Sequence, residues 1–173
     1  MNTFGMHSAW PARYAFLALP ILLTLLTMLT LLTLTMAGCA AKPPAPTEVT
    51  GTLQAAANVN PSASKRPSPL LVRVYELKSV TAFNNADFVS LYQRDQAELG
   101  TEMVGREEVT LTPGDSRPMN KMTAPETRFV GVFAAYRDLD HAKWRAVVAI
   151  QPGQKQRILV NAEELSISAV IVK

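Results

Sequence analysis

The chain has 173 residues, 48% of them hydrophobic, and its 17 Lys and Arg exceed its 14 Asp and Glu by three. All the acidic residues and 16 of the basic ones follow Cys39, and the basic residues are scattered along the sequence. A nucleic-acid partner would require clustered Lys and Arg, so this pattern argues against one. Cys39 is the only cysteine, so no disulfide can form within the chain.

An uncharged stretch of 24 residues runs from Ala15 to Gly38 and ends at Cys39. Small residues after an apolar run are typical of a cleaved export signal. The sequence Met36-Ala-Gly-Cys39 resembles the lipobox of bacterial lipoproteins, in which the cysteine thiol is acylated and the preceding peptide bond is cut. This resemblance implies a signal peptide over residues 1–38 and a lipid on Cys39. An uncleaved anchor is the alternative, because about 20 apolar residues can span a bilayer.

Residues 39–48 predict a tether that carries the lipidated cysteine. Three prolines lie between Ala40 and Pro46, and they favour an extended polyproline conformation. Residues 49–173 then form the folded part, and 135 residues remain once residues 1–38 are removed. That length is sufficient for one domain with a single core.

Hydrophobic alternation predicts a first strand over residues 48–57, followed by a connector over residues 58–69. The connector contains three prolines, three serines and two basic residues, a composition typical of a loop. Residues 70–77 predict the strongest strand of the chain, because they are rich in β-branched residues. Its two inner valines are predicted to share the buried face, opposite Arg73 and Tyr75.

The period becomes helical within residues 81–100, where Phe88, Leu91 and Tyr92 recur at i, i+3 and i+4. Gly100 is a suitable end for this short helix. The candidate N-cap residues that precede it are Asn84, Asn85 and Asp87.

Alternation then returns, with predicted turns at residues 113–115 and 152–153 that each contain Pro and Gly. Pro118 places the fourth strand at a sheet edge or at a strand start. About eight short strands with one helical insertion after the second predict an all-β antiparallel sandwich. The remaining strands are predicted over residues 107–111, 117–122, 128–136, 143–150, 156–162 and 166–172.

Few residues in the sequence are candidates for catalysis or metal binding. His141 is the only histidine after Cys39, and it lies in a predicted loop with Asp138 and Asp140. Acidic loops of this kind are usually solvated turns, and zinc sites normally need three or four protein ligands. We therefore expect no enzyme, no metal, no cofactor and no small-molecule substrate. The aromatic residues are expected in the core and not in a ligand cage: Tyr75, Phe83, Phe88, Tyr92, Phe129, Phe133, Tyr136 and Trp144.

A series of short motifs runs through the predicted domain: Arg66-Pro-Ser-Pro69, Val72-Arg-Val-Tyr75-Glu-Leu77, Phe83, Ala86-Asp-Phe88, Leu91-Tyr92, Leu99-Gly100, Pro113-Gly114, Val130-Gly-Val-Phe133, Tyr136-Arg-Asp138 and Trp144-Arg145. Behind a lipobox, their order and spacing resemble the TssJ family, the outer-membrane lipoproteins of the bacterial type VI secretion system. The resemblance covers about residues 49–172.

This resemblance implies a transthyretin-like, two-sheet sandwich with a helical insertion. It also implies a role as an anchor that binds the periplasmic C-terminal part of the inner-membrane protein TssM, with TssL in the same complex. In the family, the loop between the first two strands is the main binding element. Here that loop supplies Asn60, Pro61, Ser62, Ala63, Ser64, Lys65, Arg66 and Pro67. The alternative is a loop that is only solvated.

Ala40 bears on localisation, because Asp after the lipidated cysteine tends to retain such lipoproteins in the inner membrane. Ala40 therefore implies the periplasmic leaflet of the outer membrane. Two other functions are open at this point. One is a generic ligand-binding envelope lipoprotein. The other is a transthyretin-like hydrolase, although such enzymes use several histidines and a Tyr-Arg-Gly-Ser end, whereas this chain ends at residues 168–173 without one.

Overall fold

The computed structural model describes residues 15–34 and 46–172, in two compact units, residues 1–42 and 43–173. The first unit contains helix α1 (Ala15–Leu34), in which the hydroxyls of Thr24 and Thr27 bond to backbone carbonyls three residues earlier. Among the described residues, no helix is both long and apolar enough to cross a membrane. Cys39 and most of the predicted tether lie outside the described residues.

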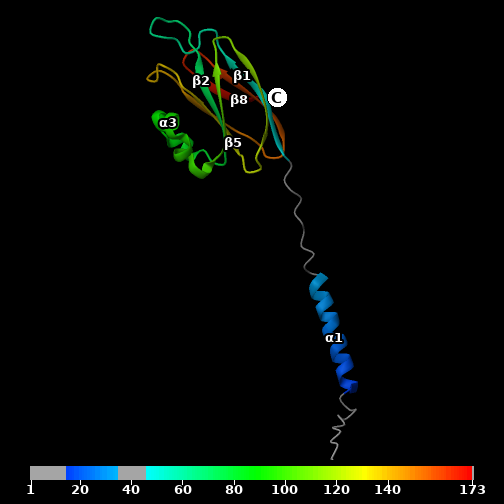
Figure 1. Ribbon diagram of the computed structural model, residues 1–173. Helices are drawn as coiled ribbons and strands as arrows, with labels where there is room; N and C mark the ends of the chain where they lie inside the picture. The colour runs from blue at the N-terminus through cyan, green and yellow to red at the C-terminus, as the bar shows by residue number, and fades with distance from the viewer. Residues whose placement is uncertain (1–14, 35–45, 173) are drawn as a thin grey trace, which may run out of the picture. The chain divides into compact units, whose positions relative to one another are not determined.

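The second unit is a sandwich of two four-stranded sheets, with strand orders β4-β1-β7-β8 and β3-β2-β5-β6 (Figure 1). The predicted all-β, two-sheet fold is confirmed. Residues 70–77 form a strand with the predicted bounds, and Pro118 lies in an edge strand as predicted. The strands are β1 (Thr47–Ala55), β2 (Leu70–Leu77), β3 (Met103–Leu111), β4 (Ser116–Thr123), β5 (Phe129–Ala134), β6 (Arg145–Ala149), β7 (Lys155–Ala162) and β8 (Ile167–Val172).

One strand pair departs from the antiparallel pattern. β1 and β7 run parallel, with Gly51 opposite Ile158, while the other strand pairs within the two sheets are antiparallel. A Cβ at Gly51 would collide with the backbone carbonyl of Ile158, so a glycine is required for this close approach. Sequence alternation gives the face of each residue but not the direction of its partner strand.

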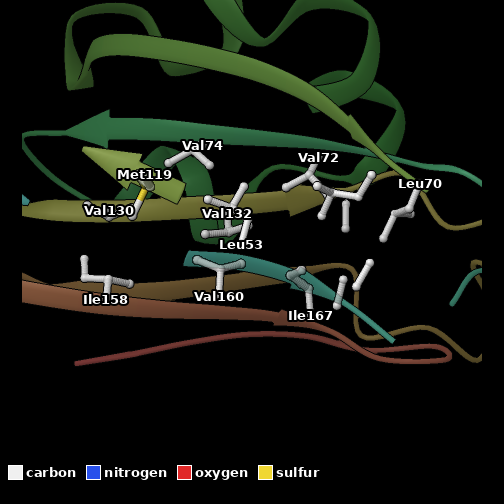
Figure 2. Packing of buried hydrophobic residues seen from close by; sticks show 14 of the residues in the cluster. Leu53, Leu70, Val72, Val74, Met119, Val130, Val132, Ile158, Val160 and Ile167 are labelled. Carbon is white, nitrogen blue, oxygen red and sulfur yellow. The ribbon is translucent and has the colours of Figure 1, made fainter. Parts of the chain in front are cut away.

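The main core lies between the two sheets and follows the predicted alternation. On β2, for example, Val72 and Val74 both face inward and are 0% and 5% exposed. Apolar side chains from both sheets interdigitate with them, as expected for a sandwich. Figure 2 labels ten residues of this cluster: Leu53, Leu70, Val72, Val74, Met119, Val130, Val132, Ile158, Val160 and Ile167.

A second, smaller core covers the outer face of the sheet that contains β2 and β5. Helices α2 (Thr81–Asn85) and α3 (Phe88–Leu99), followed by a 3-10 turn η2 (Gly100–Glu102), pack over this face. Tyr75 is therefore fully buried, although alternation alone assigns it to the face opposite the core. Its ring lies 5.6 Å from that of Phe83. Because the helical insertion covers the outer face of the sheet, both faces of β2 contact apolar side chains.

The ends of the insertion follow the predicted signals in part. Asp87 is the N-cap of α3, and its carboxylate accepts a hydrogen bond from the Ser90 N–H at 2.9 Å. The other two cap candidates, Asn84 and Asn85, instead lie inside α2. Gly100 ends α3, as predicted.

Charged side chains attach the insertion to the sheet. Asp95 of α3 is 4% exposed and accepts hydrogen bonds from the Tyr75 hydroxyl at 2.8 Å and from Arg106 at 2.8 and 2.9 Å. Arg73 donates to the carbonyls of Leu91 and Tyr92, both at 2.9 Å. The predicted aromatic core is confirmed for most of its members, but Tyr92 is 46% exposed.

Candidate docking site

The loop between β1 and β2 lies at one end of the sandwich, together with the β5–β6 loop and the β7–β8 turn. The Asn60 N–H donates to the Glu164 carbonyl at 3.0 Å, and the Arg137 N–H donates to Asn60 Oδ1 at 2.9 Å. The domain's first strand begins at the other end, where Thr47 pairs with Thr123 and accepts from the Gly153 N–H. The predicted binding loop is thus far from the point where β1 begins (Figure 1).

The tip of this loop is a hydrogen-bonded turn. The Lys65 N–H donates to the Ser62 carbonyl at 2.8 Å, and the Ser62 N–H donates to the Arg66 carbonyl at 2.8 Å. Below the turn, the Ser68 N–H donates to the Val59 carbonyl at 3.1 Å. The prolines of the loop therefore act together with backbone hydrogen bonds, and the tip has a defined shape before any partner binds.

Asn60 fixes the base of the loop. Its side chain donates to the Pro69 carbonyl at 2.8 Å and accepts from the Arg137 N–H, and the residue is only 2% exposed. Its backbone φ of 51° lies in the left-handed region, which asparagine tolerates better than most residues. Asn60 thus supports the loop from inside. The other seven predicted binding residues, 61–67, are half-buried or exposed, and their contact with a partner stays a prediction.

A surface depression of about 470 Å³ lies between the β1–β2 loop and the β5–β6 loop. Two cations line it, Lys65 and Arg137, and neither side chain has a hydrogen bond or an ion pair among the described residues. The other lining residues are Pro61, Ser62, Ala63, Asp138 and Leu165.

The only histidine in the domain lies beside this depression. His141 Nδ1 is 2.8 Å from the Asp138 carboxylate, and the two side chains are 74% and 44% exposed. The hydrogen bond to Asp138 raises the pKa of His141, and the same bond lowers the pKa of Asp138. Asp140 does not join this hydrogen bond. Within residues 15–34 and 46–172, no three His, Cys, Asp or Glu side chains are placed to hold a metal.

Sequence patterns do not indicate that the β5–β6 loop shares this end with the predicted binding loop. In the sequence, Arg137 stands out only as part of the Tyr136-Arg-Asp138 motif. Its hydrogen bond with Asn60 joins residues that are 77 positions apart in the sequence, so no local pattern predicts it. Tyr136 completes the arrangement, because its hydroxyl donates to the carbonyls of Glu163 and Ser166 at 3.1 and 2.7 Å.

Comparisons with known proteins agree with this architecture. A family model described as a type VI secretion lipoprotein that includes VasD, EvfM and TssJ matches residues 47–165. The T6SS lipoprotein TssJ1 from Pseudomonas aeruginosa is 38% identical, with a TM-score of 0.72, and the match covers 74% of this chain and 98% of that one. No curated protein sequence matches the chain.

Two other solved structures contain similar chains. Serratia marcescens Lip, a membrane bound component of the type VI secretion system, is 26% identical with a TM-score of 0.67, over 74% of this chain and 97% of that one. A chain in a structure of the T6SS protein TssM C-terminal domain from EAEC is 24% identical with a TM-score of 0.58, over 70% and 99%. That last likeness shows the fold alone. The family match and the likeness to TssJ1 together show that the chain belongs to the TssJ family of type VI secretion lipoproteins.

Proposed function

We propose that this protein is a non-enzymatic anchor that attaches the type VI secretion trans-envelope complex to the outer membrane by binding the periplasmic domain of a TssM-like protein. TssL belongs to the same complex. The observation that carries the proposal is the hydrogen-bonded turn at residues 62–66, which is exposed at the end of the domain remote from the start of β1. A lipid at the N-terminal side and a partner at the far end can then be held at once.

A preformed loop suits a docking role. Binding orders flexible segments at a free-energy cost, and a loop that already has its bound shape avoids much of it. The buried Asn60 side chain and the turn at its tip supply that order here. A chain with this fold occurs in a solved structure of a TssM C-terminal domain, which supports the choice of partner.

Membrane attachment is the second part of the proposal. We infer that Cys39 is acylated and that Ala40 directs the lipoprotein to the periplasmic leaflet of the outer membrane. Three acyl chains would make release negligible, because each buried methylene contributes about 0.8 kcal/mol, whereas a single chain binds only marginally.

Binding of the purified full-length protein, in detergent, to the periplasmic domain of the TssM-like protein tests the docking role. Replacing residues 62–67 with Gly and Ser should abolish binding while circular dichroism stays unchanged. The matched control is the same replacement in residues 151–154, the β6–β7 turn at the opposite end, which should bind as the unchanged protein does. Undiminished binding by the first variant would remove the loop assignment, and no binding by the unchanged protein would remove the function.

A further inference from the structure

The proposed docking end, at residues 58–69, 135–144 and 163–166, comprises the β1–β2 loop, the β5–β6 loop and the β7–β8 turn, and not a single loop. The Asn60 side chain bonds to the backbone of Arg137, and the Tyr136 hydroxyl bonds to the β7–β8 turn. The β1–β2 loop, the β5–β6 loop and the β7–β8 turn are thereby held in one arrangement. A partner that contacts the tip of the first loop therefore also meets the depression beside it.

The side chains that line this depression carry two positive charges and one negative charge. Lys65 and Arg137 line it and make no ion pair among the described residues, whereas the one negative charge that lines it belongs to Asp138. The Asp138 carboxylate is already engaged by His141 at 2.8 Å, and this hydrogen bond, with a smaller effect from the charge of Lys65, lowers the pKa of Asp138. An unpaired guanidinium and an unpaired ammonium on one concave surface are suited to a carboxylate, because Arg presents a planar fork and Lys a mobile point charge.

The remaining lining is largely apolar. Pro61, Ala63 and Leu165 contribute to the walls, so a group that enters loses contact with water on the side that these residues form. A carboxylate that is partly desolvated beside two cations interacts with them more strongly than one on an open surface. The chemistry of the depression thus favours an acidic side chain carried next to an apolar one.

We propose that this depression receives an Asp or Glu side chain of the protein partner, held between Lys65 and Arg137 with an apolar neighbour against Leu165. The proposal rests on the docking function above and adds the β5–β6 loop and the acidic character of the partner's contact. Arg137 and Leu165 lie outside the family's binding loop, so the structure and not the resemblance assigns them.

Charge reversal tests the assignment. The full-length protein carrying Lys65→Glu or Arg137→Glu should bind the TssM-like periplasmic domain about tenfold more weakly, and the double variant should be weaker again. The matched control is Arg157→Glu, which reverses another exposed cation that makes no ion pair among the described residues, on β7 away from the depression. It should bind as the unchanged protein does. Raising NaCl should weaken binding of the unchanged protein more than that of the double variant.

Carbodiimide cross-linking supplies an independent readout, because it joins a lysine amine to a carboxylate in direct contact. Lys65 should be linked to an Asp or Glu of the partner, and Lys65→Arg should lose the link but keep the binding. Equal affinity of the double variant and the unchanged protein, or a lysine that never cross-links in the complex, would overturn this inference while leaving the docking function intact. Absence of binding by the unchanged protein would overturn both.

Discussion

Replacing Asn60 with alanine should release the β1–β2 loop from the β5–β6 loop at the docking end. The Asn60 side chain donates to the Pro69 carbonyl at 2.8 Å and accepts from the Arg137 N–H at 2.9 Å, and the residue is 2% exposed. Alanine removes both hydrogen bonds and leaves two backbone groups without a partner. A buried polar group left unpaired costs about 1–3 kcal/mol.

The backbone conformation of residue 60 adds a second cost to the free energy of folding of the alanine variant. Asn60 has a φ of 51°, and the left-handed region costs an alanine about 1–2 kcal/mol. Because water can reach part of an end loop and pair with a freed group, we expect a total loss of about 2–4 kcal/mol in the free energy of unfolding. Partner binding should also weaken, since the depression between the loops loses its fixed width.

Urea unfolding followed by circular dichroism measures the stability term, and the docking assay measures the binding term. Asn60→Gly is the matched control, because it removes the same hydrogen bonds but accepts a positive φ. The glycine variant should be about 1 kcal/mol more stable than the alanine variant. An alanine variant as stable as the unchanged protein would refute the bridging role, and equal stability of the two variants would refute the backbone term.

Three further outcomes are expected. Gly131→Ala would place a Cβ 2.9 Å from Leu77 Cδ1 under the helical insertion, and thermal unfolding should show a loss of about 1–3 kcal/mol. Burial alone would raise the pKa of Asp95, but hydrogen bonds from Arg106 and Tyr75 outweigh it and lower that pKa. The ionised Asp95 therefore stabilises the fold above the unfolded pKa, and this contribution is lost as the pH falls below about 4. Asp95→Asn should have a lower free energy of unfolding at pH 7, and that free energy should depend less on pH. Parallel pH profiles of the two proteins would contradict this. Cys39→Ser should leave the protein unlipidated, as measured by mass spectrometry and membrane fractionation, and secretion should fail. Secretion with unlipidated protein would show that anchoring is not its function.

The strands were accessible from the sequence because their signal is local. Each side chain of a strand alternates between two faces, so a run such as residues 70–77 reveals both its bounds and its buried valines. The N-cap of α3 was ambiguous because a local signal does not distinguish between neighbouring polar residues. The sequence offers three polar residues as caps, but Asn84 and Asn85 lie inside α2, and Asp87 directly precedes α3.

By itself, the sequence determined the all-β class, most strand positions, the helical insertion and the presence of an exposed loop before residue 70. The tertiary structure decided that β1 and β7 run parallel, that α2 and α3 cover the outer face of β2 and that Asn60 meets Arg137. Each of these depends on a segment distant in the chain: a partner strand, a covering helix or a second loop. Local periodicity indicates on which face of its strand a side chain lies. Only the packing of the sheets, loops and helices determines which residues contact that face.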